Sequence, residues 1–139
     1  MRYMLDTNIV LFMASDPTRL SKNVLAILED YDNTFCISVE TVRELIVNYN
    51  NGDIASRTWH NADEMIDAIK HQYYIDILTL SEEHMRTYAH LHLNISAKHK
   101  DPSDHVIISH AITNRIPLIS SDKKFSFYIS QGLDLIENN

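Results

Sequence analysis

The chain has 139 residues, of which 45% are hydrophobic and 22% charged, a length and apolar content that fit one domain spanning residues 1–139 and leave little room for two. Its formal net charge of −7 argues against broad electrostatic attraction to nucleic acid, because phosphate binding favours basic surfaces. Only two glycines and three prolines interrupt the chain, so helices with short connections are favoured over a many-turned sandwich.

Strands and helices are predicted to alternate along the chain. Apolar runs rich in β-favouring residues predict strands, and apolar stripes with a period of 3.6 residues predict helices. In chain order, we expect a strand at Tyr3–Leu5, helices at Ile9–Ala14 and Lys22–Glu29, a strand at Phe35–Ser38, a helix capped by Ser38 and running to Tyr49, a helix at Arg57–His71, a strand at Tyr74–Leu78, a helix at Ser81–Ala97, a helix at Ser103–Asn114, a strand at Pro117–Ser120, a short helix around Phe125 and a strand at Leu133–Ile136.

This alternation is typical of a three-layer α/β fold, with a mainly parallel central sheet flanked by helices. In such folds, ligands bind beyond the carboxyl ends of the strands. Asp6 and Asp122 directly follow predicted strands and should lie at that edge. The apolar N-terminal stretch is interrupted by Asp6 and is too short to span a membrane. The lone Cys36 is expected to be a buried hydrophobe, and we expect a cytoplasmic protein.

Four acidic residues stand where a predicted strand ends or a helix begins, among apolar neighbours: Asp6, Glu44, Asp104 and Asp122. Like charges gathered in a partly dry site repel one another, so their convergence makes sense where a divalent cation neutralises them. The pattern therefore indicates hydrolytic metal chemistry. Each residue taken alone has a simpler interpretation, as a helix cap or as part of a solvated face.

Two of these residues have acidic neighbours that compete for the same role. Glu44 lies one helical turn beyond Glu40 on the same face, and the spacing does not choose between them. Asp101 and Asp104 surround a first-turn proline, so helix-start chemistry explains both charges. Asp104, however, heads an apolar stripe that points inward, where an unpaired carboxylate needs a cation or strong donors.

The eight histidines raise the alternative of a zinc site. His90 and His92 are two residues apart and lie on different faces of the predicted helix. Neither an HExxH motif nor a cysteine pair accompanies them or the pair His99 and His105, so we expect solvated or core histidines. A Gly-rich phosphate loop and a GxSxG motif are also absent, which leaves covalent serine or cysteine catalysis without support.

Four segments spread over the chain carry the acidic residues: Met4-Leu5-Asp6-Thr7-Asn8, Ile37-Ser38-x-x-Thr41-x-x-Glu44-Leu45, Lys100-Asp101-Pro102-Ser103-Asp104-x-x-Ile107-Ile108 and Leu118-Ile119-Ser120-Ser121-Asp122. In this order and at this chain length, they resemble the PIN-domain ribonucleases, and most nearly the VapC-type toxins of bacterial toxin–antitoxin systems. The resemblance covers essentially the whole chain. It departs at Ser103, where many relatives carry an aromatic residue.

The resemblance implies a Mg²⁺- or Mn²⁺-dependent endoribonuclease whose acidic quartet is Asp6, Glu44, Asp104 and Asp122. It is the resemblance that selects Glu44 over Glu40, and Asp101 matches a less constant acid. Asp6 and Asp104 are the expected direct metal ligands. The resemblance also implies an RNA substrate, a homodimer and a small antitoxin protein, which would block the acidic groove with a cationic side chain.

Two other hypotheses remain for the same residues. A binding module of this fold would hold a structural ion or none and would bind RNA or protein without turnover. A phosphatase of the haloacid-dehalogenase type would use Asp6 but needs a second aspartate two residues later, where Asn8 stands. Four lysines flank the predicted site and give it a polarity that suits a phosphodiester: Lys98, Lys100, Lys123 and Lys124.

Overall fold

Five parallel strands form a single sheet at the centre of the computed structural model, which describes residues 1–139. The strands are β1 (Arg2–Leu5), β2 (Thr34–Ser38), β3 (Ile75–Leu78), β4 (Leu118–Ser120) and β5 (Leu135–Glu137), in the spatial order β3-β2-β1-β4-β5. Every neighbouring pair is parallel. The predicted α/β fold is therefore confirmed, with a sheet that is wholly rather than mainly parallel.

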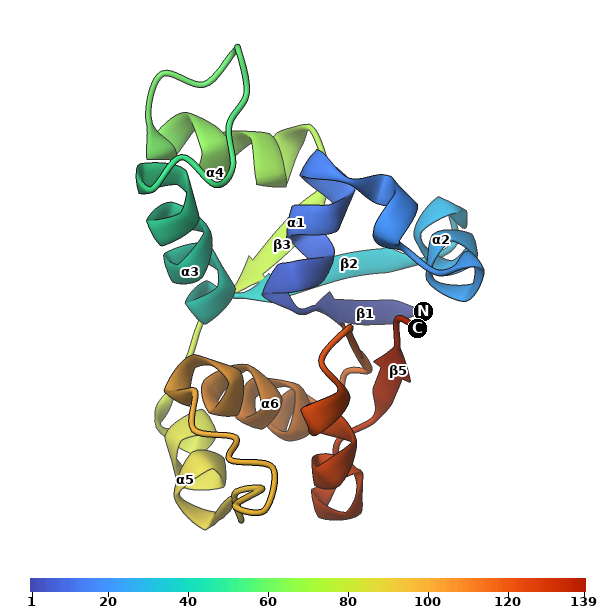
Figure 1. Ribbon diagram of the computed structural model, residues 1–139, viewed down its shortest axis with the longest axis vertical. Coiled ribbons are helices and arrows are strands. Elements are labelled where there is room, and N and C mark those ends of the chain that lie inside the picture. Colours follow the sequence, from blue (N-terminus) through green and yellow to red (C-terminus); the bar gives the residue numbers. More distant parts are fainter.

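Helices cover both faces of the sheet (Figure 1). They are α1 (Thr7–Ser15), α2 (Lys22–Glu29), α3 (Val39–Asn50), α4 (Ala62–His71), α5 (Glu82–His90) and α6 (Pro102–Asn114), with 3₁₀ helices η1 (Pro17–Arg19) and η2 (Lys123–Gln131). In Figure 1, α1 to α4 lie on one side of the sheet and α5 and α6 on the other. None of the helices combines the length and the apolar character needed to cross a membrane.

The alternation of side chains along the strands builds two separate cores, because successive residues of a strand face opposite sides of a sheet. Leu5, Ile37 and Ile119 face the core that α1 to α4 cover, and all three are fully buried. The residue before each of them faces the other core, beneath α6 and η2. Cys36 is one of these residues, and it is buried as expected.

The register of the central strands brings their carboxyl ends to one edge. Leu5 of β1 pairs with Ile119 of β4, and the amide of Asp6 donates to the carbonyl of Ile119 at 2.9 Å. Three helices then begin at this edge, and their N-caps are Asp6 for α1, Ser38 for α3 and Asp122 for η2. The parallel topology therefore gathers residues that are far apart in the chain.

Two predicted helices were too long. The helix predicted at Arg57–His71 begins at Ala62, because Asn61 caps it by accepting the amide of Glu64 at 3.0 Å. The helix predicted to reach Ala97 ends at His90. The segment from residue 91 to 101 is irregular because the side-chain oxygen of the buried Asn94 accepts the amide of Ala97 at 3.3 Å, a local bond that competes with helix formation.

Smaller differences occur near the C-terminus. The predicted short helix around Phe125 is a 3₁₀ helix that continues to Gln131, and the last strand begins at Leu135 rather than Leu133. Leu133 instead packs as a buried residue of the second core.

A buried histidine links this scaffold to α3. The Nδ1 atom of His110, on α6, lies 2.7 Å from the hydroxyl oxygen of Ser38. The His110 ring packs edge-on against the ring of His84, with 4.4 Å between the ring centroids. His110 is fully buried, and its Nε2 atom has no hydrogen-bond partner. Burial, and then the proximity of His84, lower the pKa of His110 to about 4.

This shift predicts acid sensitivity. Between pH 6.5 and about 4 the unfolded chain binds a proton at His110 that the folded protein does not, so the free energy of unfolding should fall as the pH drops through this window. His110→Gln should remove this dependence, so the stability difference between variant and wild type should change by up to about 3 kcal/mol between pH 7 and 4. Urea unfolding of both proteins across this range measures it. A difference that is constant with pH would contradict the prediction.

Candidate active site

Asp6 is held at the tip of β1 by uncharged donors. Its carboxylate accepts the amide of Thr7 at 2.8 Å and the hydroxyl of Ser120 at 2.6 Å. The side chain is buried, with 3% of the residue exposed. Asp6 therefore caps α1, as its helix-capping interpretation predicts, and also points toward β4 across the edge of the sheet.

Thr7 connects Asp6 to Glu44. While the amide of Thr7 donates to Asp6, its hydroxyl donates to the Glu44 carboxylate at 2.5 Å. Glu44 projects from α3, the helix that Ser38 caps at the end of β2. A single residue thus holds two of the predicted carboxylates side by side without supplying a positive charge.

Ser120 plays the corresponding part on the other side of Asp6. Its hydroxyl donates to Asp6 and accepts the amide of Asp122 at 3.1 Å. Asp122 in turn caps η2 by accepting the amide of Lys124 at 2.9 Å. The turn that follows β4 is therefore tied to the end of β1.

Asp104 completes the group from the first turn of α6. Its carboxylate lies 2.9 Å from the Nε2 atom of His99. One ligand atom each from His99, Asp104 and Asp122 fall within 4.8 Å of one another. The structure therefore brings together all four members of the predicted quartet, and it adds a histidine that the sequence analysis did not place there.

The electrostatics of the site reflect a surplus of negative charge. Burial first, then the charges of Asp104 and Glu44, raise the pKa of Asp6 to about 7 against the opposing effect of its hydrogen bonds. Burial, then Asp101, Asp122 and Glu44, raise the pKa of Asp104 to about 7 as well. No lysine or arginine forms an ion pair with the quartet. A divalent cation would supply the missing charge, and carboxylate oxygens are its preferred donors.

The competing acids have local partners instead. Glu40 forms an ion pair with Arg43, with Nε 2.7 Å from the carboxylate, and accepts the hydroxyl of Ser103 at 3.1 Å. Asp101 is exposed and caps α6 by accepting the amide of Ser103 at 3.0 Å. Glu44 lacks any such cation, so the electrostatic argument separates it from Glu40 where the spacing alone did not.

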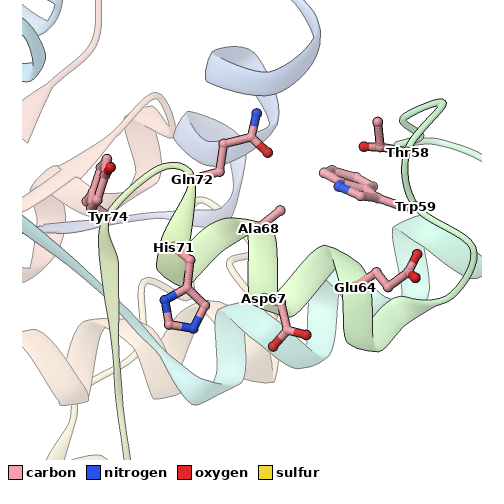
Figure 2. Close-up of a pocket in the computed structure, with 8 residues that line it drawn as sticks. All are labelled: Thr58, Trp59, Glu64, Asp67, Ala68, His71, Gln72 and Tyr74. Carbon is pink, nitrogen blue, oxygen red and sulfur yellow. The ribbon is translucent and has the colours of Figure 1, made fainter.

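Among the hollows on the surface, a small one lies beside the quartet and a larger one lies away from it. A groove of about 190 Å³ lies beside it and is lined by Arg43, Glu44, Val47, Asn48, Asp101 and Ser103. A larger, open depression of about 560 Å³ lies along α4, and Figure 2 shows its lining side chains. They are Thr58, Trp59, Glu64, Asp67, Ala68, His71, Gln72 and Tyr74. This depression contains no member of the quartet, so the smaller groove is the one that leads to the site.

The sequence pattern of the PIN-domain family matches residues 3–128 of the chain. The chain belongs to the PIN-domain family. PIN domains of toxins are in general nucleases, and PIN nucleases generally use a divalent metal. The comparison with curated protein sequences finds no match.

Solved structures share the fold of this PIN domain. A chain of VapBC2 from Rickettsia felis, bound to a promoter DNA fragment, has a TM-score of 0.72 at 22% identity, with 100% of each chain covered. A chain of VapBC-1 from nontypeable Haemophilus influenzae has a TM-score of 0.69 at 23% identity, covering 99% of this chain and 98% of that one. A chain of VapBC-5 from Mycobacterium tuberculosis has a TM-score of 0.64 at 19% identity, with 98% of both chains covered.

The uncharged residues that hold the quartet, Thr7 and Ser120, were not predicted from the sequence. Thr7 directly follows Asp6, and Ser120 lies two residues before Asp122. Hydroxyl side chains this close to the acidic residues could have been predicted to bond to them. His90 and His92 are exposed, as predicted for solvated histidines, whereas His99 is a buried histidine whose contact with Asp104 was not predicted. The irregular segment that carries His99 was predicted in part as helix, which hid its proximity to the site.

The raised pKa of Asp104 predicts that this carboxylate lowers the free energy of unfolding of the metal-free PIN domain. Without metal, the folded protein binds a proton at Asp104 between pH 3.8 and about 7 that the unfolded chain does not, so this residue lowers stability as the pH rises through that window. Asp104→Asn should therefore stabilise the metal-free protein by roughly 1–3 kcal/mol at pH 8 and by much less at pH 4. Denaturant unfolding in EDTA measures this, and an equal or lower stability of the variant at pH 8 would contradict it.

Proposed function

We propose that this PIN domain is a Mg²⁺- or Mn²⁺-dependent endoribonuclease and the toxin of a VapBC-type toxin–antitoxin pair. The observation that carries the proposal is the convergence of four carboxylates, without a lysine or arginine ion-pair partner, at the carboxyl edge of the sheet. Membership of the PIN-domain family supports it, because that family supplies nucleases of this kind.

The donor set fits a hard divalent cation. Asp6 and Asp104 would be the direct ligands, since Asp6 is buried and Asp104 half-buried. Both have a raised pKa, which a bound cation would lower again. Glu44 and Asp122 would complete the cage, position water or hold a second ion. A bound ion supplies charge neutralisation at the phosphate and a lowered pKa for its own water.

The protein residues supply position. Thr7 and Ser120 hold Asp6, Glu44 and the start of η2 in one arrangement through short hydrogen bonds, so the carboxylate oxygens are arranged before substrate arrives. Carboxylates that are not occupied by the metal accept hydrogen bonds from the attacking water and orient it toward the scissile phosphorus. The groove between α3 and α6 gives the RNA backbone access to this edge.

RNA remains compatible with an acidic protein because positive charge lies close to the quartet. Lys98, Lys100, Lys123 and Lys124 are exposed around the site. Lys124 lowers the pKa of Asp104, which places its charge near that carboxylate. Exposed lysines beside a metal site suit the phosphates that flank a scissile bond.

A cognate antitoxin and a homodimer belong to the same proposal. The structures of similar fold from Rickettsia felis and Haemophilus influenzae are named as VapBC proteins, and a similar one from Klebsiella pneumoniae is named as a toxin–antitoxin complex. For this chain, a small antitoxin would place an arginine or lysine among the carboxylates and occupy the groove. We propose the cytoplasm as the compartment where it meets RNA.

Substitution of the two neighbouring glutamates provides the sharpest test. Glu44→Gln should lower cleavage of total RNA in Mg²⁺ or Mn²⁺ by at least about a hundredfold, because a carboxylate of the metal site is lost. Glu40→Gln, one turn away on the same helix, should stay within about threefold of wild type, because Glu40 is paired with Arg43. Antitoxin-free protein is assayed by gel electrophoresis of the RNA, with an EDTA control.

Other outcomes would contradict the proposal. Equal losses of RNA cleavage in Glu44→Gln and Glu40→Gln would contradict the assignment of Glu44, rather than Glu40, to the metal site. Metal binding without any RNA cleavage by the wild-type protein would favour a non-catalytic binding module of the same fold.

A further inference from the structure

His99 is the one buried histidine bonded to a member of the quartet. Its Nε2 atom lies 2.9 Å from Asp104, and its Nδ1 atom lies 2.9 Å from the hydroxyl oxygen of Tyr128. The amide of Asn94 donates to that same oxygen at 3.1 Å. Tyr128 is fully buried and His99 is 3% exposed, so a continuous hydrogen-bonded chain runs from a backbone amide to the carboxylate, away from water.

The direction of these hydrogen bonds sets the tautomer of His99. The Tyr128 oxygen accepts the Asn94 amide, and its hydroxyl proton can be donated to Nδ1 of His99 when Nε2 carries the ring proton. An ionised Asp104 carboxylate can only accept hydrogen bonds, so Nε2 of His99 carries the proton and donates to it. In the other tautomer, Nε2 would face the ionised Asp104 carboxylate as a second acceptor, so the hydrogen bond to Asp104 would be lost.

The segment that carries His99 is clamped to η2. The His99 amide donates to the carbonyl of Asn94 at 3.1 Å, which closes the turn. Gln131 holds His92 from both sides, accepting its amide and donating to its carbonyl, each at 2.9 Å. Because Asp122 caps the start of η2, the same short helix positions one carboxylate directly and a second one through Tyr128 and His99.

We propose that His99 is a positioning residue, which fixes the Asp104 carboxylate for metal binding and is itself held as the Nε2–H tautomer by Tyr128. The inference rests on the proposed function, since it assigns His99 a part in the same metal site. His99 acts through Asp104 rather than as a ligand, because Nε2 carries a proton in its hydrogen bond to Asp104 and has no lone pair for a metal. Hard cations such as Mg²⁺ also prefer oxygen donors to imidazole.

The test measures Mn²⁺ binding by RNA-free protein, from the electron paramagnetic resonance signal of free Mn²⁺. His99→Leu should raise the dissociation constant for Mn²⁺ by about 10–100-fold, the usual effect of removing a group that orients a metal ligand. His99→Gln keeps a donor near the position of Nε2 and should stay within about threefold of wild type. His105→Leu is the matched control, since that buried histidine packs 4.6 Å from the His99 ring but bonds no carboxylate.

Nitrogen-15 spectra of the imidazoles give a second readout that does not need a variant at His99. At pH 8, where Asp104 is ionised, the wild-type protein should show His99 protonated at Nε2, and Tyr128→Phe should reduce that population and weaken Mn²⁺ binding. A proton on Nδ1 in the wild type would overturn the proposal. So would a nitrogen directly coordinated to bound Mn²⁺, since His99 would then be a ligand.

The failures of the two proposals are distinguishable. If the wild-type protein binds no Mn²⁺, the metal-dependent function itself fails. If it binds Mn²⁺ and His99→Leu binds as tightly, or if His105→Leu weakens binding to the same extent, the function stands and the positioning role of His99 is wrong.

Discussion

Repulsion among carboxylates is the constraint on which the site depends. Asp6, Glu44, Asp104 and Asp122 are gathered at one edge of the sheet, and the pKa values of Asp6 and Asp104 rise to about 7. The donors that hold them are neutral: an amide, the hydroxyls of Thr7 and Ser120, and an imidazole. Neutral donors fix geometry without cancelling charge, so the negative potential stays available for a cation.

The parallel sheet makes this arrangement possible. Its strand ends share one edge, and each helix that begins there presents an N-terminal turn whose amides tolerate a nearby carboxylate. Asp6 and Asp122 use those amides as N-caps, and Asp104 lies in the first turn of α6. Helix capping and metal binding are therefore not alternatives for these residues, because one side chain can satisfy both.

Part of the site could be predicted from the sequence because its residues follow strands directly. Asp6 and Asp122 could be placed at the sheet edge from the apolar runs before them, and the fold followed from the alternation of strands and helices. Glu44 could not be separated from Glu40 by spacing, although Arg43, three residues after Glu40, forms the ion pair that distinguishes them. His99 escaped prediction because the helix before it ends at His90 and the segment that follows is held by the local hydrogen bonds of Asn94.

The most direct measurement is the affinity of the metal-free wild-type protein for Mn²⁺, compared with that of Asp6→Asn at pH 7.5 by isothermal titration calorimetry. We expect saturable binding by the wild type and a loss of at least about tenfold in affinity for the variant, which keeps the shape of Asp6 and one accepting oxygen but not its charge. No binding by the wild type, or equal affinity in both proteins, would contradict the claim that the quartet exists to hold a cation.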